Sequence, residues 1–70
     1  MTLRDFNRLS ETGKDETVEL KGSFIEETTI PGYKVALYKV DSFFVEVYYD
    51  LKSQVIRRFK GCVRSDLMYS

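Results

Sequence analysis

The segment from Ser23 to Val63 constrains the fold most, because aromatic and β-branched residues crowd it. Short polar stretches interrupt it at Pro31-Gly32, at Asp41-Ser42 and over residues 50–54. Such residues between turn formers are typical of strands. They predict strands over residues 23–30, 33–40, 43–49 and 55–63. Connections this short join only antiparallel neighbours, so we predict a four-stranded antiparallel β-meander.

Residues 1–22 are predicted to be helical. Thr2 with Asp5 forms a shortened capping box, and Ser10 is a second N-cap candidate for a helix over residues 11–21. Gly22 lies where a C′ glycine is expected to end this segment. The apolar side chains predicted to face inward are Leu3, Phe6, Leu9, Val18 and Leu20. Because Gly13 weakens the middle of the segment, we predict two short helices or one bent helix.

The chain is therefore predicted to be a single α+β domain over residues 1–70. Its parts are a helical segment (1–22), the β-meander (23–63) and a tail (64–70). The turns also predict the register. A two-residue loop at Asp41-Ser42 places Val40 opposite Phe43, Tyr38 opposite Val45 and Ala36 opposite Val47. A five-residue loop over 50–54 places Tyr49 opposite Val55, Val45 opposite Phe59 and Glu46 opposite Arg58.

This register gives the sheet two faces. Face A is predicted to pack on the helical segment. Its residues are Ile25, Ala36, Tyr38, Val40, Phe43, Val45, Val47, Tyr49, Val55 and Phe59. Face B is the opposite side. Its residues are Phe24, Glu26, Tyr33, Val35, Leu37, Lys39, Phe44, Glu46, Tyr48, Ile56, Arg58 and Lys60.

Face B does not alternate between polar and apolar as a solvated sheet face normally does. Large apolar patches on small domains are usually covered by a partner. We therefore predict a protein-interaction module that forms a homodimer, or binds another protein, through face B. The residues predicted to form this interaction face are Val35, Leu37, Phe44, Tyr48 and Ile56.

A basic cluster near the C-terminus gives the alternative function. It consists of Arg57, Arg58, Lys60 and Arg64. Basic side chains beside exposed rings are typical of surfaces that bind single-stranded nucleic acid. Charges on a terminal strand also discourage aggregation, and a pI near 6.2 is low for a nucleic-acid-binding domain. Protein interaction is therefore favoured over nucleic-acid binding.

Charge is balanced over the whole chain but is unevenly distributed. Residues 1–32 carry 4 basic and 7 acidic side chains, whereas residues 33–70 carry 7 basic and 4 acidic ones. A dipolar molecule of this kind can attract its own copies or present one face to a polyanion, but the favoured interpretation is that the acidic half neutralises the basic half within the fold.

The chain has no histidine and one cysteine, which excludes several chemistries. Histidine-based acid–base catalysis, zinc sites of Cys and His, and an intramolecular disulfide all need residues that it lacks. Glu46 and Asp50 lie ~13 Å apart along a strand, too far to act as a carboxylate pair. We expect no enzymatic activity, cofactor or metal. Cys62 is expected to be a small buried hydrophobe. Without a visible signal peptide or apolar span, we expect a cytoplasmic location and no membrane partner.

The central strands carry a resemblance. Residues 32–38 read Gly-Tyr-Lys-Val-Ala-Leu-Tyr, and residues 43–50 read Phe-Phe-Val-Glu-Val-Tyr-Tyr-Asp. This resembles a pattern in small bacterial proteins without an assigned activity, which read Gly-Tyr-Arg-Val-Ala-Leu-Tyr and Phe-Phe-Val-Glu-Val-Trp-Tyr-Asp. Tyr48 stands where that pattern has tryptophan. The resemblance implies a bacterial cytosolic origin and a meander, and no activity.

Overall fold

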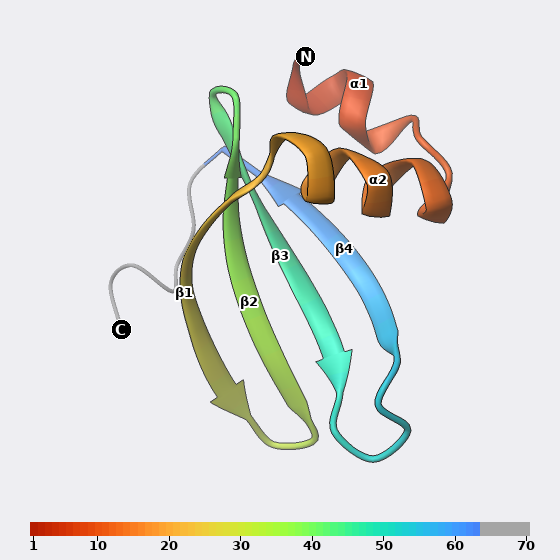
Figure 1. The fold of residues 1–70 in the computed structure, drawn as a ribbon, viewed down its shortest axis with the longest axis vertical. Coiled ribbons are helices and arrows are strands. Elements are labelled where there is room, and N and C mark those ends of the chain that lie inside the picture. Colours follow the sequence, from red (N-terminus) through yellow and green to blue (C-terminus); the bar gives the residue numbers. More distant parts are fainter. Residues whose placement is uncertain (64–70) are drawn as a thin grey trace.

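The computed structural model describes residues 1–63, so the predicted tail (64–70) and Arg64 lie outside the described residues. Its elements are α1 (Leu3–Asn7), α2 (Glu11–Lys21), β1 (Ser23–Ile30), β2 (Tyr33–Val40), β3 (Phe43–Asp50) and β4 (Ile56–Cys62). The four strands form one sheet in the order β1-β2-β3-β4, with antiparallel neighbours (Figure 1). The predicted α+β fold with an antiparallel meander is confirmed.

Two helices form, and both predicted N-caps are confirmed. Thr2 Oγ1 accepts the Asp5 N–H at 3.2 Å, and the Asp5 carboxylate accepts the Thr2 N–H at 3.2 Å. Ser10 Oγ accepts the Gly13 N–H at 3.1 Å. Each bond satisfies a backbone donor that the helix leaves unpaired, so the chain starts a second helix at Glu11 rather than extending the first.

Gly22 does not lie at the predicted C′ position. This residue is the C-cap of α2 with φ −77° and ψ 138°, which is extended backbone open to any residue. Glycine is needed there for a different reason: a Cβ at this position would collide with the Val18 carbonyl oxygen, which accepts the Gly22 N–H. The turn from α2 into β1 thus depends on a close backbone approach.

Both helices lie on face A, as predicted. α1 contacts β4, and α2 contacts β2 and β4. The core between helices and sheet is formed by Phe6, Val18, Val40, Phe43, Val45, Val47 and Phe59. The rings of Phe6 and Phe43 lie 5.6 Å apart at its centre.

Leu20 does not join this core, contrary to the prediction. Its side chain is 84% exposed, whereas Val18 is buried. Two residues along an α-helix correspond to a turn of about 200°, so a helix that buries Val18 presents Leu20 on its outer side.

The β2–β3 register is as predicted, with Val40 opposite Phe43, Tyr38 opposite Val45 and Ala36 opposite Val47. The β1–β2 turn at Pro31-Gly32 has φ +84° at Gly32, as a type II turn requires.

The predicted β3–β4 register is wrong by two residues at Phe59, which lies opposite Val47. Val55 belongs to the loop, and a bulge at Arg57 inserts another residue. A two-residue shift keeps Phe59 on face A and leaves Arg58 and Lys60 on face B. Ile56 precedes the bulge and lies opposite Tyr49, so it belongs to face A instead of face B.

A second bulge, at Ile25, changes the predicted face of Phe24. Phe24 lies opposite Tyr38, and their rings are 5.7 Å apart on face A. Beyond the bulge, Glu26 lies opposite Leu37 on face B, as predicted. Sequence alternation alone does not mark where such an insertion falls.

Candidate interaction surfaces

The structure does not bring the five predicted interaction residues together as one exposed patch. Val35 and Leu37 are 2% and 0% exposed, and Phe44 and Tyr48 are half-buried. Ile56 lies on the opposite face. β2 is an internal strand, so side chains of β1 and β3 flank Val35 and Leu37 from both sides. Exposure of these two residues was predicted wrongly.

The middle of face B is also more polar than the sequence suggested. Glu26 and Glu46 flank Leu37 across the ladder, and Glu46 is buried opposite Lys60. Among the described residues, the Oε1 atom of Glu26 is buried without a hydrogen-bond partner. Covering the Glu26 carboxylate with an apolar partner would remove more of its water, which costs free energy. This part of face B is therefore a poor site for apolar association.

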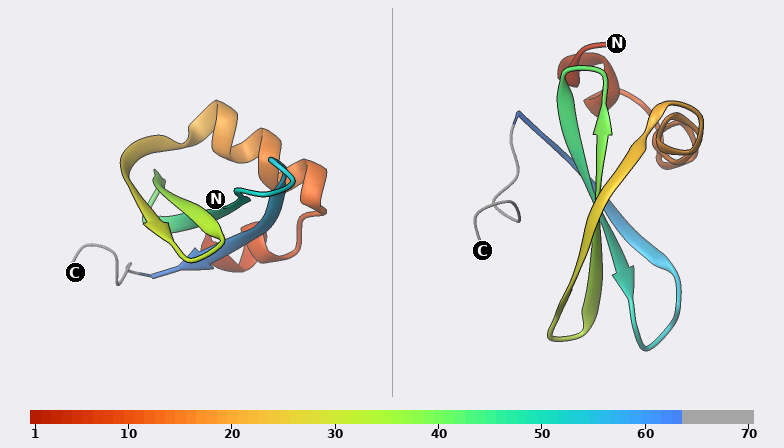
Figure 2. Two further views of the ribbon diagram at one scale, coloured as in Figure 1. Left: turned by 90° about the horizontal axis from the view of Figure 1, so that it is seen from below. Right: turned by 60° about the vertical axis from the view of Figure 1, so that its left-hand side comes forward.

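Face A, in contrast, is only partly covered. Both helices lie at the end of the sheet near the β2–β3 turn, and the strands continue well beyond them (Figures 1 and 2). A hollow of about 340 Å³ lies on this face, and Glu27 and Lys34 are its charged lining residues. Its apolar lining, which we call the open half of face A, is Ala36, Tyr38, Val47, Tyr49 and Ile56. Ile56 is 42% exposed.

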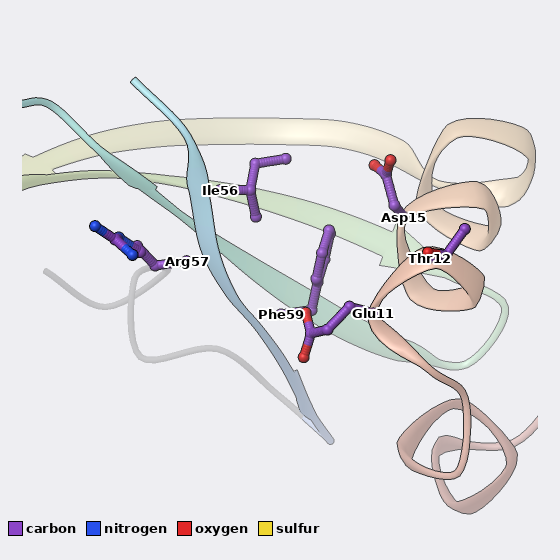
Figure 3. Close-up of a pocket in the computed structure, with 6 residues that line it drawn as sticks. All are labelled: Glu11, Thr12, Asp15, Ile56, Arg57 and Phe59. Carbon is purple, nitrogen blue, oxygen red and sulfur yellow. The ribbon is translucent and has the colours of Figure 1, made fainter. Parts of the chain in front are cut away.

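A second hollow of about 530 Å³ separates α2 from β4 (Figure 3). Glu11, Thr12 and Asp15 of α2 line one wall, and Ile56 and Phe59 of β4 line the other. Ile56 borders both hollows, and we call the two together the groove beside α2. One wall of this groove is acidic and its floor is apolar.

A third hollow, of about 380 Å³, includes the start of the basic cluster. Ile30, Tyr33, Tyr48, Arg57 and Arg58 line it. The Arg58 guanidinium lies 5.8 Å from the centre of the Tyr48 ring, and the Tyr33 ring packs edge-on against Tyr48 at 6.2 Å. Two of the four predicted nucleic-acid contacts, Arg57 and Arg58, thus meet two aromatic rings.

The other two predicted contacts are not part of this hollow. Lys60 lies farther along β4, opposite Glu46, and Arg64 is outside the described residues.

Asp50 organises the loop that carries Arg57. Its Oδ1 accepts the N–H groups of Lys52 and Ser53 at 2.8 and 3.1 Å, and its Oδ2 accepts Arg57 Nε–H at 3.3 Å. These three donors, the Ser53 and Lys52 N–H groups foremost, hold the pKa of Asp50 below its ordinary value. An aspartate at a strand end before polar residues is the sequence signal for such a turn.

Cys62 is half-buried at the end of β4 on face B. Its thiol donates to the Phe44 carbonyl oxygen at 3.7 Å. Within residues 1–63, no group of three His, Cys, Asp or Glu side chains could hold a metal ion. In the same range, neither helix has the length and apolar character needed to cross a membrane.

Comparisons with protein-family models, curated proteins and solved structures give no significant match.

Proposed function

We propose that this chain is a non-catalytic protein-interaction domain that self-associates through an apolar sheet surface, the open half of face A. The observation that carries the proposal is the partial cover of face A: the hollow that Tyr38, Tyr49 and Ile56 line is accessible, and Ile56 is 42% exposed. Apolar sheet surface next to a hydrophobic core is usually covered in the functional state.

The partner is proposed to be a second copy. The groove has an acidic wall on α2, with Glu11 and Asp15, and its other end carries the Lys34–Glu27 pair. In a two-fold assembly, each surface meets its own copy in reverse, so the acidic wall of one chain can face Lys34 of the other. A homodimer is the smallest closed assembly of this kind. The resemblance to small bacterial proteins and the lack of a second cysteine support a bacterial, cytoplasmic setting.

Light scattering on matched variants tests this proposal. Ile56→Asp places a charge in the hollow and should convert the dimer to a monomer. Val55→Asp is the control, because Val55 is adjacent, 47% exposed and not part of the hollow's lining. Circular dichroism establishes that both variants fold. A dimer that survives Ile56→Asp unchanged would contradict the proposed surface.

Single-stranded nucleic acid is a second candidate ligand, favoured by the hollow of Tyr33, Tyr48, Arg57 and Arg58. Rings stack on bases, and guanidinium groups neutralise phosphates. In a salt titration with a fluorescent single-stranded oligonucleotide, Arg58→Gln should weaken binding. Arg58→Gln should also reduce, by roughly 0.7, the slope of the logarithm of the association constant against the logarithm of the salt concentration. Lys52→Gln, in the exposed loop, is the control. Equal effects of the two substitutions would reject this site.

A further inference from the structure

We propose that the tail of the same chain, residues 64–70, covers the middle of face B. The tail lies outside the described residues, and what carries the proposal is the burial of described side chains on this face. The proposed self-association concerns face A, so the two proposals are independent of each other.

Val35 and Leu37 are more deeply buried than their place in the sheet accounts for. Neighbouring strands close the sides of a side chain on β2 but leave its outer end open. Ala36 and Tyr38 show this on face A: they lie on the same strand, between the same neighbours, and are only half-buried. Both helices pack on face A. At 2% and 0% exposure, Val35 and Leu37 therefore need a covering layer that residues 1–63 do not supply.

The edge strand β1 has the same asymmetry between its two faces. Glu26 and Thr28 lie on face B and are half-buried, whereas Glu27 and Thr29 lie on face A and are exposed. An edge strand has a neighbouring strand on one side only, so the sheet itself buries its side chains least. The covering layer on face B therefore extends from β2 to β1.

The covering segment also has to bring a hydrogen-bond donor. The Oε1 atom of Glu26 is buried without a partner among the described residues, and Glu46 is buried on the same face. The tail combines a base with apolar side chains. Arg64 carries N–H donors that suit carboxylates, whereas Leu67 and Met68 provide apolar area for the buried side chains of β2. This combination matches face B better than a purely apolar partner does.

The end of β4 places the tail within reach of this surface. Cys62 lies opposite Phe44 on face B, and Leu37 is two strands away from β4, opposite Glu46. Two strand spacings and two residues along a strand place Leu37 about 12 Å from Cys62. Leu67 follows Cys62 by five positions, and five extended residues span about 17 Å. Leu67 can therefore reach Leu37 without a change in the sheet.

Cys62 provides a probe of this cover, because its half-buried thiol lies on face B. In the intact chain, Leu67→Asp should speed alkylation of Cys62 by about tenfold or more, since a carboxylate is expelled from an apolar surface. Leu51→Asp is the matched control, because Leu51 is exposed in the β3–β4 loop, and it should leave the rate unchanged. Circular dichroism establishes that both variants fold. Equal alkylation rates in wild type and Leu67→Asp overturn the proposed cover.

A cross-linking arm locates the tail without a charged substitution. In a Cys62→Ser background, Leu67→Cys is combined either with Thr28→Cys on face B or with Thr29→Cys on face A. A short bismaleimide should link the two cysteines within one chain clearly faster in the Thr28→Cys protein. Equal rates in the two proteins overturn the proposed cover.

Dilution distinguishes the tail from a second copy on the same face. The alkylation rate of Cys62 in the wild-type chain should not depend on protein concentration. A rate that rises on dilution would show that a second copy covers face B and would overturn the role of the tail. Leu67→Asp should leave the dimer dissociation constant unchanged, so failure of this proposal is distinguishable from failure of self-association through face A.

Discussion

The Asp50 carboxylate and the Arg57 guanidinium lie 3.3 Å apart across the β3–β4 loop. Two backbone N–H groups of the loop bind the same carboxylate. Asp50 therefore links the end of β3 to the bulge at Arg57. This bulge matters beyond the loop, because it places Ile56 on face A, where Ile56 borders both hollows of the groove.

The first prediction concerns the pH dependence of stability. The pKa of Asp50 is lowered in the folded chain, so its ionised form stabilises the fold above the ordinary value of 3.8. That contribution is lost as the pH falls through the lower folded-state pKa. Asp50→Asn should therefore be less stable than wild type near neutral pH, and the difference should shrink in acid below 3.8.

Urea unfolding of both proteins across this pH range measures the effect. Asp41 also has a lowered pKa, but it is present in both proteins and cancels from the comparison. A difference in unfolding free energy that stays constant with pH would show that the Asp50 charge has no part in the folded state.

The second prediction concerns the end of α2. Gly22→Ala should lower the free energy of unfolding by about 1–3 kcal/mol, because the added methyl group meets the Val18 carbonyl oxygen and the backbone must move. Ser23→Ala, one residue later and exposed, should change it by less than about 0.5 kcal/mol. Chemical denaturation of the two variants measures both effects, and a Gly22→Ala variant as stable as Ser23→Ala would contradict the steric explanation.

The third prediction contrasts two apolar residues of the helical segment. Phe6 is fully buried against Phe43, and Phe6→Ala should cost about 3–5 kcal/mol, enough to unfold much of so small a domain. Leu20→Ala should change the stability of the monomer by less than about 0.5 kcal/mol. Thermal melts at low protein concentration provide the comparison. A large loss from Leu20→Ala in the monomer would place Leu20 in the core after all.

Much of the fold follows from local signals in the sequence. The turns at Pro31-Gly32 and Asp41-Ser42 fix the strand boundaries, and the two-residue loop fixes the β2–β3 register. The N-caps at Thr2 and Ser10 fix where the helices begin. These features depend on neighbouring residues only, which is why alternation and capping rules predict them.

The groove could not be predicted in the same way. Its position depends on how far the helices extend over face A, which is a property of the packed chain. The bulges at Ile25 and Arg57 place Phe24 and Ile56 on face A. The residue pattern of the strands does not predict where a bulge occurs. For Leu20, the rotation of α2 was decided by Val18, Phe6 and the sheet rather than by spacing within the helix.

Sedimentation velocity of the unmodified chain tests directly whether a second copy covers the open half of face A. At tens of micromolar and moderate salt, we expect a species of twice the chain mass of 8.2 kDa that dissociates on dilution. A single species of 8.2 kDa at every concentration would contradict it.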